Sequence, residues 1–173
     1  LRRAGWIEEH KGTYTLSDTG RALAQRCRAA NPKHRYFYDE FFTRSVGSAA
    51  HARFCEAVYG RDLTQHGMLD LAQLEALIAL LELTPRSRVL ELGCGSGRIA
   101  EYISDATRAQ VTGLDTSAVG IAQAAARTAG RRQQLSFLQG DIRTLPFERN
   151  TFDAVIAIDR SEERRVGKEC ATG

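Results

Sequence analysis

The chain has 173 residues, of which 43% are hydrophobic and 26% are charged, and its formal net charge is +3 at pH 7. This composition is typical of one globular domain or two small ones, and it excludes fibrous and disordered classes. Its apolar stretches are broken by charges and stay short of the ~20 residues that a membrane-spanning helix needs. Basic residues form no run of five and alternate with acidic ones, so charge alone does not predict nucleic-acid binding.

The cysteines indicate a reducing compartment. The chain has four cysteines, Cys27, Cys55, Cys94 and Cys170. None of them lies in a CxxC spacing or beside a histidine pair that would complete a zinc site, so we expect no metal. The opening LRRAGWIEEH lacks the apolar core of a secretory signal. We therefore expect a cytoplasmic protein without membrane partners.

Both ends of the sequence have non-native features. The chain begins at Leu1 rather than Met, inside a helix-like segment, which indicates a truncation. Residues 160–170 read RSEERRVGKEC, which resembles the translation of a sequencing-library adapter. The alternative is a charged helical terminus, because SEERR offers i, i+4 charge pairs. We expect native sequence to end near Asp159 and residues 160–173 to be a non-native tail.

The first part of the chain predicts a β-hairpin and then a helix. Trp6–Glu9 and Thr13–Leu16 are strand-like and flank a glycine-containing turn. Ser17 is a suitable N-cap for a helix that ends before Asn31-Pro32. The phrase LRRAGWIEEHKGTYTLSDTGRAL, read as helix, hairpin and helix, resembles the end of a winged-helix domain. Residues 1–33 are therefore predicted to be a partial winged-helix segment.

Residues 34–84 predict a helical region. Two segments, HRYFYDEFFTRSV and SAAHARFCEAVYG, carry aromatic residues at helical spacing. Asp70 followed by Gln73 is a capping-box start for a helix over Leu71–Leu83, which Thr84-Pro85 ends.

After Pro85 strands and helices alternate, which predicts an α/β fold built on a parallel sheet. Strands are expected at Val89–Leu92, Val111–Leu114, Leu135–Leu138 and Phe152–Ile158, and helices at Arg98–Ser104 and Ala118–Thr128.

The first of these strands runs into a glycine-rich turn, VLELGCGSGR, with glycines at 93, 95 and 97. Glycines permit a sharp turn and let the backbone approach a ligand, and the following helix N-terminus favours a negative group. A dinucleotide enzyme would show GxGxxG, whereas the third glycine falls one place early here. A purely structural turn would need only one or two of these glycines.

Acidic residues end the four strands in turn: Glu91, Asp115 in VTGLD, Asp141 in FLQGDI and Asp159 in FDAVIAID. The carboxyl ends of parallel strands line the ligand crevice of an open sheet. There, Asp115 can accept from both hydroxyls of a ribose, and Asp141 can accept from an adenine amino group while Ile142 packs on the ring.

Together VLELGCGSGR, VTGLD, GDIRTLPF and FDAVIAID resemble the sequential motifs of class I S-adenosylmethionine-dependent methyltransferases. The resemblance implies a Rossmann-like sheet in residues 85–159, truncated after its fourth strand, which lies beside the first, with S-adenosylmethionine as cofactor. It implies that the glycine-rich turn surrounds the methionine part, with Cys94 as a small loop residue rather than a nucleophile. The implied cofactor-binding residues are Glu91, Gly93, Cys94, Gly95, Gly97, Asp115, Thr116, Asp141, Ile142, Asp159, Tyr38 and His66.

The segments YDEFF and YGRDLTQHGM resemble the lid of small-molecule methyltransferases in this class. Tyr36, Tyr38, Tyr59 and His66 are candidates for contact with cofactor or substrate. The alternative is that the tyrosines are packing residues and that His66 only lies on a loop.

Two functions follow from these patterns. The first is S-adenosylmethionine-dependent methylation of a small molecule, a direct displacement that needs alignment more than a catalytic residue, so none is assigned; the fragment itself is expected to be inactive. The second is a transcription regulator with a methyltransferase-like ligand-sensing domain, which would bind DNA only through the incomplete winged helix. The sequence predicts neither the acceptor nor the oligomeric state.

Overall fold

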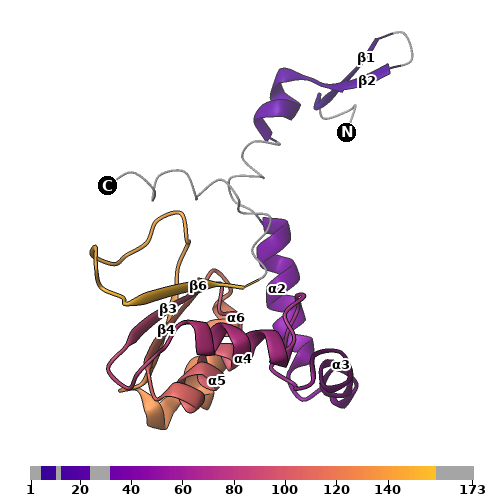
Figure 1. The fold of residues 1–173 in the computed structure, drawn as a ribbon. Coiled ribbons are helices and arrows are strands. Elements are labelled where there is room, and N and C mark those ends of the chain that lie inside the picture. The colour runs from indigo at the N-terminus through magenta and orange to yellow at the C-terminus, as the bar shows by residue number, and fades with distance from the viewer. Residues whose placement is uncertain (1–4, 11–12, 24–31, 159–173) are drawn as a thin grey trace. The chain divides into compact units, whose positions relative to one another are not determined.

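The structure is a computed structural model that describes residues 5–10, 13–23 and 32–158 (Figure 1). The chain forms two compact units, Leu1–Phe37 and Tyr38–Gly173. Within the described ranges, every helix is too short or too polar to cross a membrane.

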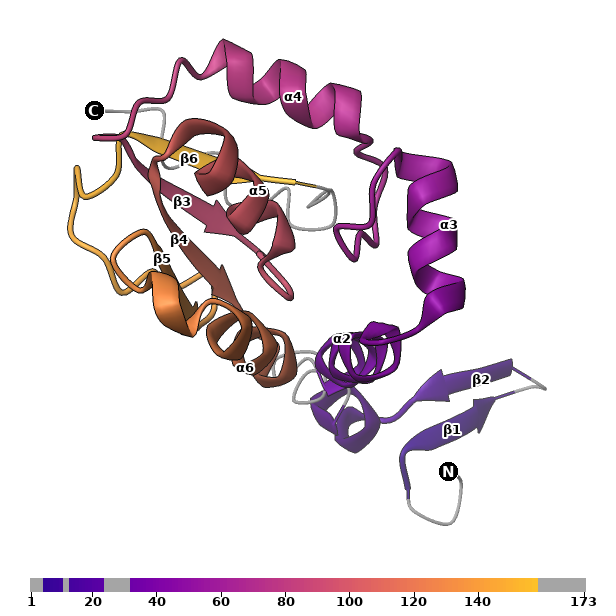
Figure 2. The ribbon, with the colours of Figure 1, turned by 90° about the horizontal axis from the view of Figure 1, so that it is seen from below.

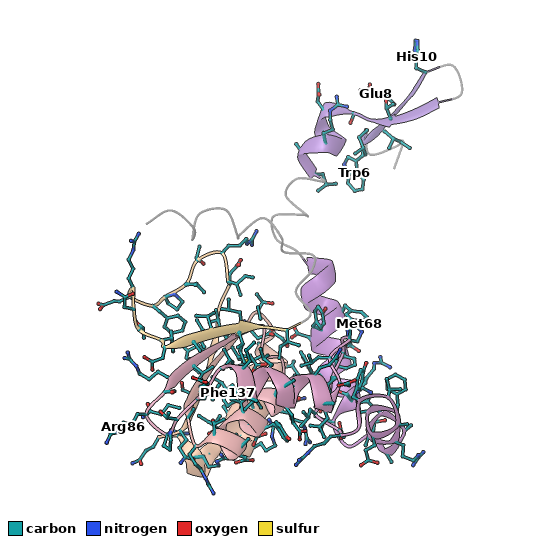
Figure 3. The ribbon with its side chains drawn as sticks, in the orientation of Figure 1. Trp6, Glu8, His10, Met68, Arg86 and Phe137 are labelled. Atoms are coloured by element: carbon teal, nitrogen blue, oxygen red, sulfur yellow. The ribbon has the colours of Figure 1, made fainter. Side chains whose placement is uncertain are left out.

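The first unit contains the predicted hairpin and helix. Strands β1 (Ile7–His10) and β2 (Thr13–Leu16) pair antiparallel, and the side chains of Glu8 and His10 are exposed on β1 (Figure 3). Ser17 Oγ accepts a hydrogen bond from Gly20 N at 3.0 Å and so caps the helix at 18–23, as predicted. The expected end of this helix lies outside the described residues.

Three helices precede the sheet: α2 (Pro32–Ser45), α3 (Ala49–Tyr59) and α4 (Leu71–Leu80). The capping box at Asp70 and Gln73 is present, which confirms the predicted start of α4. The predicted end at Leu83 is wrong. The helix stops at Leu80 because the chain turns there and Glu82 adopts a left-handed φ of 49°.

The second unit is built on a four-stranded parallel sheet in the order β5-β4-β3-β6. Its strands are β3 (Arg88–Leu92), β4 (Gln110–Asp115), β5 (Leu135–Gln139) and β6 (Ala154–Ala157), with α5 (Arg98–Thr107), α6 (Ala118–Arg127) and a short 3₁₀ turn η1 (Ala129–Arg131) between them. The α/β fold and the place of the fourth strand beside the first are confirmed. Strand β6 is shorter than the predicted Phe152–Ile158.

The core lies between the sheet and helices α4 and α5, and α6 packs on the same face against β4 and β5 (Figure 2). Val89, Val111 and Leu135 are register partners across β3, β4 and β5 and form an apolar row that is at most 2% exposed. Leu74 of α4 and Ile103 of α5 cover this row. Burial of these side chains fixes where the strands end, and therefore where the loops that follow them lie.

Candidate functional site

The glycine loop, residues 93–97, connects β3 to the N-terminus of α5. Gly93, Gly95 and Gly97 have φ values of 73°, 53° and 73°, which side chains rarely allow. The amides of Gly93 and Cys94 donate to Leu114 O at 2.7 and 3.1 Å, and Gly97 N donates to Cys94 O at 2.8 Å. The loop is thus folded back onto β4 by its own backbone.

Asp115 joins this loop to the end of β4. Asp115 is 6% exposed, and one carboxylate oxygen accepts from Gly95 N while the other accepts from Ser117 N, both at 2.8 Å. A carboxylate oxygen can accept more than one hydrogen bond, so these two contacts do not by themselves exclude a ligand donor. Asp115 therefore orders the loop and can also receive ligand hydroxyls.

Glu91 supplies a second buried carboxylate close by. It is 2% exposed and lies on β3 opposite Gly113 of β4 and Ile156 of β6. Cys94 is 7% exposed inside the loop, and its Sγ fills the space beside Gly113. This packing fits the expected role of Cys94 as a small loop residue.

The glycines also have packing reasons that the sequence did not show. A Cβ at Gly95 would overlap the ring of Phe42 from α2, and one at Gly97 would overlap Phe137 and Ala124. Phe137 projects from β5 into the interior of the unit (Figure 3). Side chains of the protein itself therefore leave no room for a Cβ at these two positions, in addition to any requirement of a ligand.

The structure brings Thr116 and the segment after β5 to the same edge as Asp115. Gly140 N donates to Asp115 O at 2.9 Å, and Gln139 Nε2 donates to Thr116 O at 3.2 Å. Asp141 and the half-buried Ile142 follow directly. The predicted ribose and adenine residues are therefore neighbours.

Asp141 is held by an arginine that the predictions did not include. Arg143 donates to the carboxylate through its backbone N at 2.9 Å and through its guanidinium at 2.5 to 3.0 Å. These hydrogen bonds hold the pKa of Asp141 below its ordinary value. Asp141 thus stays ionised at neutral pH and can accept a hydrogen bond.

The residues predicted to form a lid make an aromatic cluster next to the glycine loop. The His66 ring lies edge-on to Tyr38 at 5.8 Å and to Phe41 at 4.9 Å between centroids, and Tyr38 stacks with Phe42 at 6.3 Å. Phe42, 6% exposed, covers Gly95. Tyr38 and His66 are therefore brought together, and Phe42 links them to the loop.

The other residues of the predicted set are placed as follows. The Tyr59 hydroxyl donates to Gly67 O at 2.9 Å and its side chain is 9% exposed, so Tyr59 packs within the lid. Asp159 and the side chain of Tyr36 lie outside the described residues, as does the predicted tail at 160–173. Within the described ranges, His, Cys, Asp and Glu form no group of three that could hold a metal ion.

Polar contacts from α2 to α6 were missed by the sequence analysis. Ser117 Oγ, at the N-cap of α6, donates to Asp39 at 2.6 Å, and Gln123 Nε2 donates to Phe42 O at 3.0 Å. The partners are 78 and 81 residues apart, so no local spacing could pair them.

Comparison with known proteins agrees with this arrangement. Residues 89–171 match the family described as a methyltransferase domain. A sterol 24-C-methyltransferase of Gibberella zeae is 38% identical over 109 residues, covering 61% of this chain and 28% of the relative. A malonyl-[acyl-carrier protein] O-methyltransferase of Enterobacter lignolyticus is 38% identical over 104 residues, covering 57% of this chain and 39% of the relative. The chain thus spans about a third of the length of these relatives.

The solved structures give the same fold. A methyltransferase of Geobacter sulfurreducens, crystallised with S-adenosyl-L-homocysteine, superposes with a TM-score of 0.50 at 25% identity, over 63% of this chain and 43% of that one. A structure of a Haloferax volcanii methyltransferase activator in complex with a methyltransferase superposes with a TM-score of 0.51 at 23% identity. The match covers 69% of this chain and 46% of that one. The glycine loop, the acidic strand ends, the strand order and these matches together support a class I S-adenosylmethionine-dependent methyltransferase domain in the second unit.

Proposed function

We propose that this chain is the cofactor-binding part of an enzyme that transfers a methyl group from S-adenosylmethionine to a small molecule. The observation that carries the proposal is the Asp115 carboxylate, which is buried at the carboxyl end of β4 and accepts a hydrogen bond from Gly95 N of the glycine loop. The relative from Geobacter sulfurreducens has S-adenosyl-L-homocysteine bound on the same fold.

The residues at this edge match the chemistry of that cofactor. The N-terminus of α5 suits the carboxylate of an amino-acid group, and Glu91 and Asp115 suit an ammonium and ribose hydroxyls. Asp141 and Ile142 suit the adenine. The bound cofactor supplies an electrophilic methyl group, and the protein orients it and excludes water.

A small-molecule acceptor is favoured by the lid and by the relatives. The relatives named above are a sterol 24-C-methyltransferase and a malonyl-[acyl-carrier protein] O-methyltransferase. The aromatic cluster of Tyr38, Phe41 and His66 offers apolar surface beside the cofactor edge. Acceptor-binding residues in this class are expected after β6 as well, so we assign no catalytic residue. A cytoplasmic location stays a prediction.

Methyl transfer tests the proposal. A longer protein that contains this chain would be incubated with S-adenosylmethionine tritiated in the methyl group and with sterol, fatty-acid and acyl-thioester acceptors. We expect label in an organic-soluble product. Label found only in protein or nucleic acid would contradict a small-molecule acceptor.

A second candidate function rests on the hairpin of the first unit. The β1–β2 hairpin followed by a capped helix is compatible with the end of a winged-helix domain, and so with a transcription regulator whose second unit senses a ligand. Fluorescence anisotropy with random duplex DNA would test it: steep loss of binding with added salt supports DNA contact, and no binding opposes it.

A further inference from the structure

Arg127 contacts the glycine loop from a direction that the cofactor residues do not use. It lies in the last turn of α6, and its side chain is 28% exposed. One guanidinium nitrogen donates to Ser96 O and another to Glu101 in the first turn of α5, each at 2.5 Å. The planar guanidinium therefore joins three pieces of structure: the loop, α5 and α6.

The contact to Ser96 O fixes a whole peptide unit. A trans peptide is planar, so the carbonyl of Ser96 and the amide of Gly97 point in opposite directions. The carbonyl is bound by Arg127, and the amide is bound by Cys94 O at 2.8 Å. Because both ends are held, this peptide cannot rotate without losing two hydrogen bonds, although glycine at 97 would otherwise permit it.

We propose that Arg127 is a positioning residue that sets the glycine loop for the methionine part of the cofactor. This inference rests on the proposed function, which places that part of the ligand on residues 93–97. The Glu101 carboxylate orients the guanidinium, and the charges of Glu101 and Arg127 suit the dipoles of α5 and α6. Neither side chain needs to touch the cofactor.

A matched control lies one turn away. Arg131 NH2 pairs with Asp105 of α5 at 2.7 Å, and this arginine is 32% exposed. The pair connects the region after α6 to α5 as Arg127 does, but it involves no atom of the glycine loop. Arg127→Gln and Arg131→Gln therefore remove similar charges, and only the first releases Ser96 O.

The first arm of the test needs no ligand. Amide hydrogen exchange of the full chain would be followed at Gly95 and Gly97. Arg127→Gln is expected to speed this exchange about three- to tenfold, and Arg131→Gln to leave it unchanged. Arg127→Lys keeps the charge but lacks the planar guanidinium that presents separate nitrogens to Ser96 O and Glu101, so an intermediate rate is expected. Equal rates in all four proteins would overturn the inference.

The second arm uses two ligands, one with and one without an amino-acid group. Arg127→Gln should weaken S-adenosylhomocysteine binding about fivefold and leave methylthioadenosine binding unchanged. Equal weakening of both ligands, or the same effect from Arg131→Gln, would show general destabilisation and contradict the inference. Failure of the unsubstituted chain to bind either ligand would instead contradict the proposed function, while the exchange arm still decides whether Arg127 holds the loop.

Discussion

At the scale of single residues, Asp115 has a structural role and a proposed binding role, and two measurements on one variant distinguish them. It orders the loop through Gly95 and Ser117, and we propose that it also binds the ribose. Asp115→Ala is expected to weaken S-adenosylmethionine binding by about 1 to 3 kcal/mol, because the hydroxyls lose a charged acceptor. Isothermal titration calorimetry measures this change.

The control for Asp115 is Asp105→Ala, which removes an acid whose side chain is 61% exposed on α5. It should leave affinity unchanged. A thermal melt without ligand would record how much of the Asp115→Ala effect comes from loss of the loop contacts. Equal affinities for Asp115→Ala and the parent chain would remove Asp115 from the site.

The Asp141–Arg143 pair makes a prediction about pH. Since the pKa of Asp141 is lowered in the folded state, its stabilising contribution is present above the unfolded pKa and is lost as pH falls through the folded pKa. Arg143→Gln should raise the pKa of Asp141 toward its ordinary value. Carboxyl carbon NMR titration checks this, with exposed Arg149→Gln as control. An unchanged titration in Arg143→Gln would show that the pair is not formed.

The sequence predicted which residues lie at the carboxyl ends of the strands, but it did not predict which side chains contact them. Glycines and acids at strand ends follow from local spacing, so the positions of Gly95, Asp115 and Asp141 were predictable. The contacts of Arg127 and Asp39 join segments that are distant in sequence, so they depend on how the helices pack.

At the scale of elements, α2 is part of the candidate site because its residue Phe42 packs directly against the glycine loop. The Phe42 ring is 6% exposed and packs against Gly95 and Gly120. Phe42→Ala should lower the free energy of unfolding by about 3 kcal/mol, because the cavity would lie between α2 and the loop. Urea denaturation monitored by circular dichroism measures this loss.

Phe54→Ala provides the comparison for Phe42. Phe54 lies on α3 and is 51% exposed, so its removal should cost less than about 1 kcal/mol. Similar losses for the two variants would mean that α2 does not pack on the loop in solution.

The limits of element prediction have physical causes. The capping box fixed the start of α4, but its end depends on a left-handed Glu82 that no residue preference signals. The aromatic spacing correctly predicted α2 and α3, yet it did not predict burial: Phe37 and Phe54 remain about half exposed, and Phe42 carries the packing.

At the scale of the whole molecule, the sheet has one face covered by helices and an edge at β6. Among the described residues, β6 pairs with β3 alone, and Val155 on it is 57% exposed. An apolar edge strand favours association between chains. Val155→Lys is expected to reduce the high-molecular-mass fraction in size-exclusion chromatography.

A conservative Val155→Thr variant, which keeps β-branching without adding charge, should change that fraction less. If the chain elutes as a single monodisperse species before any substitution, the β6 edge is not an association site and the expectation is wrong.

The strand order, the glycine loop and the acidic strand ends together predict that the second unit binds the adenosyl sulfonium rather than a nicotinamide dinucleotide. Calorimetric titration of the 173-residue chain with S-adenosylmethionine, repeated in competition with NAD, tests it most directly. We expect one-to-one binding of S-adenosylmethionine that NAD at the same concentration does not displace. Preferential displacement by NAD, or absence of S-adenosylmethionine binding by a folded chain, would contradict it.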